Sequence, residues 1–490
     1  MREDIFVHEP FLKELENIGW NDKTNGCEVI RLDRLHQKPE QSYRESFSDV
    51  VMKSKLRESL LKINDFLEED QIEECVTRLT SYSSNGLITN NSKIFELLLN
   101  GMSVSENRKT KDKSPTVKFI DFEKQENNSF IAVSELGIKA KGSEDKFYPD
   151  ITLFVNGIPL VVVEAKSPKV SITDAISDLN YYQENSQKLF YYNQICVGIN
   201  KGKALYGTIG SQFAHYSKYK LEDLAELELL VERTPTAQDI LIYSLFKKEM
   251  LLDIIRNFTI YEIDQGRTIK KLPRYQQLRA VNKIVKRLKT ENKGGVVWHT
   301  QGSGKSITMV YLATKLRREE AGFDNPTIIV VTDRIDLDNQ ISSTFRRTGF
   351  SNPIQAVSIS NLKELLKDSY GKTLLTTIHK FQERAQEQKE EIEILSDKSN
   401  VFVLIDEAHR SQYGMTAAYM RNSLPNAKFI AFTGTPIDKE EKSTLRTFYG
   451  GSDYIDKYTI KQSVEDGNTL AIRYQTGMPE YFIEKDLMNE

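Results

Sequence analysis

The sequence predicts a multidomain α/β protein in which an α+β domain is followed by a lobe built on a parallel sheet. Short β-rich runs follow one another between residues 117 and 210, with one helical stretch among them. From residue 272 onward, short β-branched strands alternate with helical segments, which is the pattern of a parallel sheet covered on both faces. At 490 residues the chain has room for about two to four domains.

The bulk composition is that of an ordinary globular protein, with 39% hydrophobic and 28% charged residues. A net charge of −3 argues against a wholly basic nucleic-acid coat and leaves room for local basic tracks. Cys27, Cys75 and Cys196 stand far apart, which disfavours a zinc site or a disulfide framework. The N-terminus lacks a secretory signal, and no apolar run is long enough to span a bilayer. We therefore expect a cytoplasmic protein without membrane contact.

The first domain should contain a mostly consecutive sheet with a helix before its last strand. Ile172, Ala175, Ile176 and Leu179 recur at helical spacing. Residues 1–110 mix helical patterns with polar connections, and the leucine-rich residues 221–260 predict a helical connector. We expect the strands of the first domain at 117–122, 129–133, 151–155, 160–165 and 194–199, and those of the parallel sheet at 294–299, 327–332, 373–378, 401–405 and 428–433.

Two carboxylates and a lysine gather around one predicted hairpin, in the stretch "PDITLFVNGIPLVVVEAK". Glu164 and Lys166 are two residues apart in a strand, so they point to the same face. Asn156-Gly157 marks the turn. A two-residue turn would place Asp150 opposite Val163, on the wrong face, whereas a three-residue turn would place it opposite Glu164. We therefore predict a three-residue turn, 156–158, which allows a glycine-type bulge.

This arrangement suits the hydrolysis of a phosphodiester. Asp150 and Glu164 can bind Mg²⁺, while Lys166 can orient water or help to deprotonate it. The pattern resembles that of PD-(D/E)xK nucleases. An exposed hairpin with a Glu–Lys pair is the alternative, but two charges at the end of an otherwise buried strand favour the nuclease. Many such nucleases carry a Gln-x-x-x-Tyr pair where this sequence has Asp178 and Tyr182, and the aspartate departs from that pattern.

The stretch "HTQGSGKS", residues 299–306, is typical of a nucleotide-binding loop except that a histidine replaces its first glycine. It lies between a predicted strand and a predicted helix, which is the context that phosphate binding needs. An incidental glycine turn is the alternative. Lys305 would supply positive charge, and the hydroxyl of Ser306 would hold Mg²⁺. We expect the ATP-binding residues of this loop to be Thr300, Gln301, Gly302, Ser303, Gly304, Lys305 and Ser306.

Two adjacent acids follow the predicted strand "VFVLI". Asp406 can hold magnesium through water, and Glu407 can take a proton from the attacking water. A solvated helix N-terminus would also favour acids, but a buried strand that ends in two carboxylates is costly without a cation. We therefore predict that Asp406 and Ser306 share the Mg²⁺ of bound ATP.

These motifs resemble the RecA-like motor core of superfamily-two helicases and translocases. "DEAH" at 406–409 is similar to their second motif, and "FTGTP" at 432–436 to the motif that couples nucleotide state to DNA. The coupling residues would be Thr433, Gly434 and Thr435. "LPRYQQ" resembles the adenine-recognising element, which implies that Gln277 reads adenine with Arg274 beside it. The resemblance also implies that loops in 330–340 and 376–382 face a DNA backbone.

Residues 271–289 contain seven Lys or Arg residues and no acid. Leu278, Val281, Val285 and Leu288 form one apolar stripe, which leaves the basic residues pointing outward. A solvated face and a direct contact with DNA fit this pattern equally well.

A nuclease followed by such a motor, with "VEAKSP", "HTQGSGKS", "DEAHRSQYG" and "FTGTP" in this order, resembles the restriction (R) subunit of type I restriction–modification enzymes. The resemblance implies ATP and Mg²⁺ as cofactors. It implies double-stranded DNA and the methyltransferase and specificity subunits as partners. In that family, the motor translocates DNA and the nuclease cuts unmodified DNA far from the recognition sequence.

The resemblance also implies a domain organisation. We expect an endonuclease domain at 1–220, a helical connector at 221–265, a first motor lobe at 266–458 and the start of a second lobe at 459–490. Family members are about twice as long, so we expect an N-terminal fragment that binds ATP weakly, hydrolyses it poorly and cannot translocate.

Two alternatives remain open from the sequence. One is a stand-alone DNA repair helicase–nuclease, which differs in needing no methyltransferase partner. The other is a DNA-binding scaffold with degenerate sites, against which the presence of Lys166, Lys305 and Glu407 argues.

Overall fold

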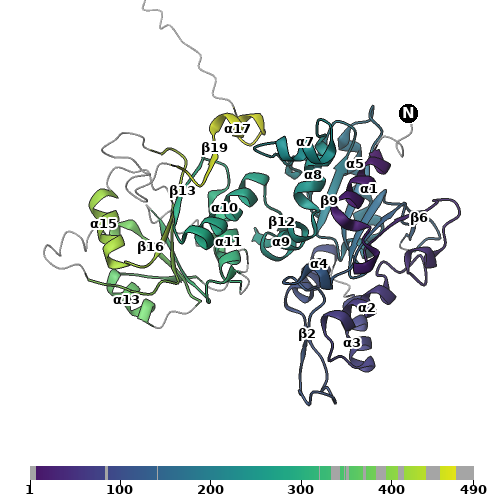
Figure 1. Cartoon of the computed structure of the whole chain (residues 1–490), viewed down its shortest axis with the longest axis horizontal. Coiled ribbons are helices and arrows are strands. Elements are labelled where there is room, and N and C mark those ends of the chain that lie inside the picture. The colour runs from purple at the N-terminus through teal and green to yellow at the C-terminus, as the bar shows by residue number, and fades with distance from the viewer. Residues whose placement is uncertain are drawn as a thin grey trace, which may run out of the picture.

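The structure is a computed structural model with two sheet-based bodies lying side by side (Figure 1). Helices of the second body face the first, and the helical connector lies between them. The structure describes residues 7–82, 86–140, 142–318, 321–332, 343–346, 348, 353–367, 371–381, 393–406, 413–436 and 453–470.

The first body is built on a six-stranded mixed sheet in the order β1-β4-β7-β8-β9-β10. Neighbouring strands are antiparallel except for the parallel pairs β1–β4 and β8–β9. The mostly consecutive order is therefore confirmed. The strands are β1 (Glu28–Arg31), β4 (Phe130–Ser134), β7 (Ile151–Val155), β8 (Ile158–Ala165), β9 (Ile195–Ile199) and β10 (Ala204–Gly207).

Helix α5 (Ile172–Asn185) covers β8 and β9 with the predicted apolar stripe, which is buried. Gly198 of β9 permits this close approach, because a Cβ there would lie 3.2 Å from the side chain of Ile176. The other α-helices and the hairpins of this body are α1 (Glu9–Leu15), α2 (Lys53–Ile63), α3 (Glu69–Thr80), α4 (Leu87–Asn100), α6 (Gln187–Phe190), β2–β3 (Met102–Ser103 and Thr116–Val117) and β5–β6 (Ile138–Lys139 and Lys146–Phe147).

The strand predicted at 117–122 is wrong, because only Val117 of that run is in a strand, β3. Side chains satisfy the backbone that a sheet would have paired. The Asn64 side-chain amide donates to the Lys118 carbonyl and accepts from the Lys118 N–H. Oδ1 of Asp121 accepts hydrogen bonds from the N–H groups of Glu123 and Lys124. Strand β1, by contrast, comes from the N-terminal region, for which no strand was predicted.

The predicted three-residue turn between β7 and β8 is also wrong. Val155 pairs with Ile158, so the turn has only two residues, Asn156 and Gly157, with φ of 54° and 75°. The Asn156 side chain is buried and fixes this turn by accepting from the Ser129 N–H and donating to the Phe119 carbonyl.

The extra residue lies instead within β8. Leu153 pairs with Val161 but Phe154 pairs with Pro159, which leaves Leu160 as a β-bulge. Beyond the bulge, Ile151 pairs with Val163. Continued by one residue, this register places Asp150 opposite Glu164, as predicted.

The second body contains a seven-stranded parallel sheet in the order β15-β16-β14-β17-β18-β13-β19. All five strands predicted for it are confirmed. The strands are β13 (Gly295–His299), β14 (Thr327–Thr332), β15 (Ile354–Gln355), β16 (Thr373–Thr377), β17 (Val401–Asp406), β18 (Lys428–Thr433) and β19 (Asp456–Tyr458).

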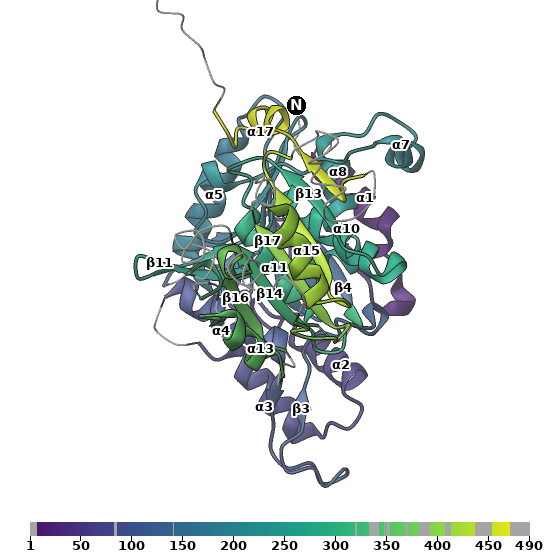
Figure 2. The same cartoon turned by 90° about the vertical axis from the view of Figure 1, so that its left-hand side faces the viewer.

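Helices cover both faces of this sheet. Helices α10 (Tyr275–Glu291) and α11 (Lys305–Leu316) lie on the face toward the first body, and α13 (Ile359–Lys367) and α15 (Tyr413–Ser423) lie on the other, in front of the sheet in Figure 2. Successive residues of a strand point to opposite faces of the sheet. Accordingly, Val297 packs in the core with α10 and α11, whereas Val296 packs in the core with α13 and α15.

Between the bodies lie α7 (Ala225–Val231), α8 (Ala237–Leu245), α9 (Lys248–Asn257) and a hairpin of β11 (Ile260–Asp264) and β12 (Arg267–Lys271). The helices were predicted, whereas the hairpin was not. Lys270 of β12 is buried and donates to the side chains of Asn91 and Gln194 and to the Asn193 carbonyl. These bonds, with one core that runs through both bodies, join the connector firmly to the first body.

The last described segment contains α17 (Ile460–Glu465) and the turn after it, within the residues 459–490 that were expected to begin a second lobe. All three cysteines are free and buried. Across the described ranges, none of the helices has both the length and the apolar character needed to cross a bilayer.

Candidate functional sites

The first candidate site lies where β7 begins and β8 ends. Asp150 directly precedes β7, and its Oδ2 accepts a 2.6 Å hydrogen bond from the backbone N–H of Ala165. Glu164 is only 3% exposed. The structure therefore brings Asp150 and Glu164 to the same place, through the bulge at Leu160.

Lys166 and helix α5 complete this site. The Lys166 ammonium donates to Oε1 of Glu164 at 2.9 Å and lies 2.6 Å from Oδ2 of Asp178. The Tyr182 hydroxyl donates to the same Glu164 oxygen at 3.4 Å. Asp178, which departs from the glutamine of the nuclease pattern, thus pairs with the lysine.

Burial dominates the electrostatics of this cluster. It raises the pKa of Glu164 well above its ordinary value, and the neighbouring charge of Asp150 raises it further. Burial alone would lower the pKa of Lys166, but the carboxylates of Glu164 and Asp178 outweigh it and raise that pKa. Burial and the charge of Glu164 likewise raise the pKa of Tyr182. At neutral pH, Lys166 is therefore a cation and Tyr182 a neutral donor.

The cluster fits a divalent cation. Oε2 of Glu164 is buried and has no hydrogen-bond partner among the described residues, although a buried carboxylate oxygen normally has one. Two further residues, His8 and Glu135, approach Asp150. Neither was predicted, because neither belongs to a recognisable motif.

The second candidate site is the loop between β13 and α11. Gly302 and Gly304 have φ of 77° and 85°, the left-handed region that favours glycine. Ser303 is 2% exposed, and its hydroxyl has no partner among the described residues. A buried, unsatisfied hydroxyl in a glycine loop at a helix N-terminus fits a phosphate group.

His299, which replaces the first glycine of the loop pattern, has a structural role. It ends β13 and is fully buried, with Nε2 2.8 Å from Oδ2 of Asp456. Arg279 and Lys283 also bind Asp456. Burial alone would raise the pKa of Asp456, but the hydrogen bonds from His299 and Arg279 lower it to about 2. Burial lowers the pKa of His299.

The predicted adenine-recognising element contacts this loop directly. The Gln277 amide accepts from the Arg274 N–H at 2.8 Å and lies 3.4 Å from the carbonyls of both Ser303 and Gly304. A Cβ at Gly304 would lie 2.4 Å from Nε2 of Gln277. The Arg274 guanidinium binds the side chain of Asn468.

The predicted coupling motif packs against the same loop. Thr433 is fully buried, and its hydroxyl accepts from the Thr435 N–H at 3.2 Å. Trp298 donates to the Gly434 carbonyl at 3.2 Å, and a Cβ at Gly434 would lie 3.2 Å from the Gln301 nitrogen. A change in the conformation of the loop would therefore displace residues 433–435.

Asp406 ends β17 at the edge of the sheet from which the loop rises. It is buried and pairs with Phe432 of β18, and β18 lies between β17 and β13. Strand spacing places β17 about 10 Å from β13. Glu407 lies outside the described residues, as do 333–340 and 382 of the segments predicted to face DNA.

The basic segment 271–289 forms the end of β12 and most of α10. Its predicted apolar stripe is buried. Arg279 and Lys283 are engaged by Asp456 and Glu222. At least these two basic residues therefore form ion pairs within the fold, which is neither of the two alternatives that the sequence left open.

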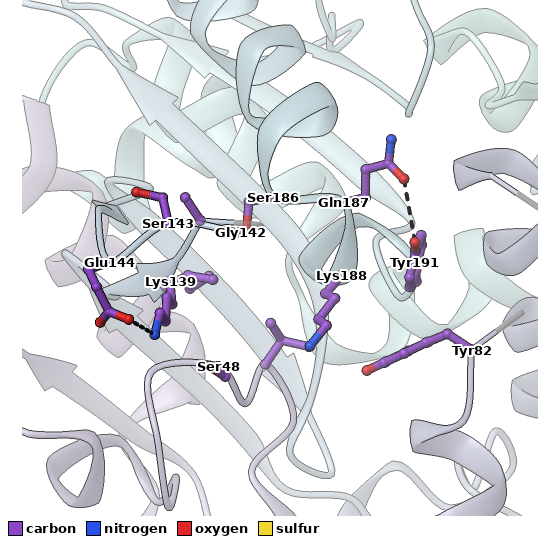
Figure 3. Close-up of a pocket in the computed structure, with 13 residues that line it drawn as sticks. Ser48, Tyr82, Lys139, Gly142, Ser143, Glu144, Ser186, Gln187, Lys188 and Tyr191 are labelled. Carbon is purple, nitrogen blue, oxygen red and sulfur yellow. Dashed lines mark hydrogen bonds and ion pairs between the residues drawn. The ribbon is translucent and has the colours of Figure 1, made fainter. Parts of the chain in front are cut away.

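A separate cavity of about 600 Å³ lies between the β5–β6 hairpin and α6 (Figure 3). Lys139 and Glu144 pair on one side of it, and Tyr191 and Gln187 are hydrogen-bonded on the other. None of the predicted site residues lines this cavity.

Both halves of the chain match known protein families. Residues 1–214 match the family described as type I restriction enzyme R protein N terminus, and residues 276–490 match the SWI2/SNF2 ATPase family. The chain is related to the endonuclease subunits of type I restriction enzymes. The family resemblance inferred from the ordered motifs is thereby confirmed.

Curated relatives support this relationship. The chain is 36% identical over 506 residues to the type I restriction enzyme HindI endonuclease subunit of Haemophilus influenzae, covering 98% of this chain and 46% of that protein. It is 30% identical over 515 residues to the putative type I restriction enzyme MjaIXP endonuclease subunit of Methanocaldococcus jannaschii, covering 100% and 47%. The chain thus spans about half the length of these relatives.

Among solved structures, a fragment of a putative HsdR subunit of a type I restriction enzyme from Vibrio vulnificus is 16% identical. The match covers 69% of this chain and 56% of that one, with a TM-score of 0.29, which is too low to compare the two in detail.

Proposed function

We propose that this chain provides the endonuclease and the ATP-dependent DNA translocase of a type I restriction–modification complex. In this role it cuts unmodified double-stranded DNA at sites remote from the recognition sequence. The observation that carries the proposal is the convergence of Asp150, Glu164 and Lys166 on one buried cluster. The curated relatives, all named as restriction endonuclease subunits, favour this function over a stand-alone repair helicase–nuclease.

In the proposed PD-(D/E)xK centre, Asp150 and Glu164 would hold Mg²⁺, which would neutralise charge on the phosphate and activate water. Lys166 is held between Glu164 and Asp178. Because its pKa is raised, it stays protonated and acts by orienting water and binding the scissile phosphate, and another group removes the proton. Tyr182 keeps its own proton and positions Glu164 through their hydrogen bond.

In the proposed ATP site, the backbone of 300–304 binds the phosphates and Lys305 reaches their outer oxygens. Ser306 and Asp406 would hold the Mg²⁺ of the nucleotide, and Glu407 accepts the proton of the attacking water. Gln277 reads the adenine, with Arg274 beside it. The contact of Gly434 with Gln301 supports Thr433, Gly434 and Thr435 as the residues that couple hydrolysis to DNA.

The partners follow from the family alone. We propose that the protein binds double-stranded DNA along the motor and docks on methyltransferase and specificity subunits. Since sequence recognition belongs to the specificity subunit in this family, the chain itself needs no base-specific contacts.

The test is reconstitution of the protein with its methyltransferase and specificity subunits on long unmethylated DNA. ATP consumption and DNA breakage are followed together, and fully methylated DNA is the matched control. We expect both activities on unmethylated DNA and neither breakage nor sustained ATP consumption on methylated DNA. Equal breakage without the methyltransferase would instead support the repair helicase–nuclease.

A further inference from the structure

Three residues from separate elements surround a point beside the proposed nuclease centre. His8 directly precedes α1, Glu135 directly follows β4, and Asp150 directly precedes β7. We propose that His8, Glu135 and Asp150 hold a second divalent cation, adjacent to the Asp150–Glu164 site. This inference rests on the proposed nuclease function, because the two sites share Asp150.

The distances suit coordination. Nε2 of His8 is 3.5 Å from Oδ1 of Asp150, and its Nδ1 is 4.0 Å from Oε1 of Glu135. One ligand atom from each of the three residues lies within 4.8 Å of the others. Ligands bound at about 2.1 Å are about 3 Å apart when adjacent and about 4.2 Å apart when opposite. Because an ion takes only one ring nitrogen of His8, a small reorientation of the imidazole and the carboxylates would complete the site.

The backbone holds the two carboxylates next to each other. The Glu135 N–H donates to the Asp150 carbonyl at 2.9 Å, which extends the β4–β7 pairing by one step. The Glu135 carbonyl accepts from the Gln37 amide at 2.9 Å. Glu135 has φ of 54°, a left-handed conformation that a glutamate rarely adopts. Its placement is therefore imposed by its surroundings.

His8 is equally well fixed. It is 5% exposed, and its neighbours on α1, Phe11 and Leu12, are fully buried. Phe11 packs edge-on against Phe246 of the connector, with 6.0 Å between ring centroids. The ring therefore reaches Asp150 from an anchored helix, as a metal-binding histidine requires.

Charge at the cluster favours a cation. Glu135, Asp150 and Glu164 bring three carboxyl groups together, and the neighbouring Lys166 is already engaged by Glu164 and Asp178. Independently, Oε2 of Glu164 is buried without a hydrogen-bond partner among the described residues. Carboxylates so close together, one of them buried and two largely covered, are costly unless a cation compensates. A divalent ion bound by Asp150 would lower the energetic cost of keeping the Glu135 and Glu164 carboxylates charged.

The ligand set also indicates which ion binds best. Oxygen ligands alone suit Mg²⁺ and Ca²⁺, whereas an imidazole nitrogen shifts preference toward transition ions such as Mn²⁺. The site with His8 should therefore bind Mn²⁺ more tightly than Mg²⁺. The competing possibility is that His8 is a protonated imidazolium that bridges two carboxylates without any metal.

The test uses the 490-residue chain with Mn²⁺ as the probe, without DNA or nucleotide. Pulsed electron paramagnetic resonance detects a nitrogen nucleus bound to Mn²⁺, and calorimetry measures its affinity. We expect a nitrogen coupling that is lost in His8→Gln, and an Mn²⁺ affinity about 10- to 100-fold weaker in His8→Gln and Glu135→Gln. The matched control is His36→Gln, because His36 is exposed and pairs with Asp33 at the surface; this variant should keep both properties.

An unchanged nitrogen coupling in His8→Gln, or unchanged Mn²⁺ affinity in both variants, would overturn the proposal; the latter result would favour the imidazolium bridge. Thermal unfolding without metal verifies that each variant folds. Lys166→Ala separates this inference from the proposed nuclease, because it should keep the Mn²⁺ nitrogen signal while losing cleavage. If Lys166→Ala still cuts DNA, the nuclease assignment fails even where the nitrogen signal depends on His8.

Discussion

Oδ2 of Asp150 accepts a 2.6 Å hydrogen bond from the backbone N–H of Ala165, and this contact fixes the carboxylate beside Glu164. It exists because the extra residue of β8 is held in a bulge and not in the regular ladder. The bulge at Leu160 shifts every later residue of β8 by one position. Without that shift, Asp150 would face Val163 and the proposed centre would not form.

Deleting Leu160 should leave DNA cleavage by the assembled enzyme and its ATP binding largely intact. The deletion joins Pro159, the partner of Phe154, directly to Val161, the partner of Leu153, so it restores a regular ladder and keeps Asp150 opposite Glu164. Leu160 is also fully buried, so we expect a loss of stability on the order of 2–5 kcal/mol. Cleavage of circular DNA and nucleotide binding are measured in parallel.

A second deletion makes this test specific. Deleting Val161 together with Leu160 leaves no spare residue in β8, so Glu164 moves opposite Ile151 and, with Lys166, to the other face of the sheet. Cleavage should be lost in this double deletion while ATP binding is kept. Full cleavage by the double deletion would contradict the register argument.

Gly304→Ala should weaken ATP binding at least tenfold. The alanine methyl would lie 2.4 Å from the Gln277 amide, and φ at this position is 85°. Gly302→Ala is the matched control, because φ there is similar but the nearest atom is 3.8 Å away, so we expect a smaller effect. Titration with a fluorescent ATP analogue gives the affinity of each variant.

Gln277→Ala tests the origin of that difference. With the amide removed, Gly304→Ala should cost less, and a double-mutant cycle should give a coupling of about 0.5–3 kcal/mol. Strictly additive effects would show that the Gln277–Gly304 contact does not shape the loop.

Asp456→Asn should destabilise the motor lobe and reduce its sensitivity to acid. The pKa of Asp456 is about 2 in the folded chain against an ordinary 3.8, so its carboxylate contributes about 2 kcal/mol above pH 4. This contribution is lost as the pH falls from about 4 through 2. Thermal unfolding should show a clear deficit for the variant at pH 7 that shrinks below pH 4. The exposed Asp453→Asn should behave like the unmodified chain at every pH, and an equal deficit in both variants would refute the role of the buried cluster.

The sequence predicted those features that depend on short-range pattern. Continuous β-branched runs identified the parallel strands, and the apolar stripe of 172–179 identified α5. The turn length could not be predicted, because Asn156 is held by Ser129 and Phe119, which only the folded chain brings near. His8 and Glu135 were missed for the same reason, since no local spacing connects them to Asp150. The role of His299 likewise depends on Asp456, far along the chain.

The central claim is that Asp150, Glu164 and Lys166 form a single phosphodiester-cleaving centre, separate from the ATP site. The most direct measurement follows DNA breakage and ATP hydrolysis together in the assembled enzyme carrying Lys166→Ala, with Lys169→Ala, on the loop that follows, as the control. We predict that Lys166→Ala abolishes breakage while ATP hydrolysis stays within about twofold of the unmodified enzyme, and that Lys169→Ala retains both activities. Undiminished breakage by Lys166→Ala would contradict the account.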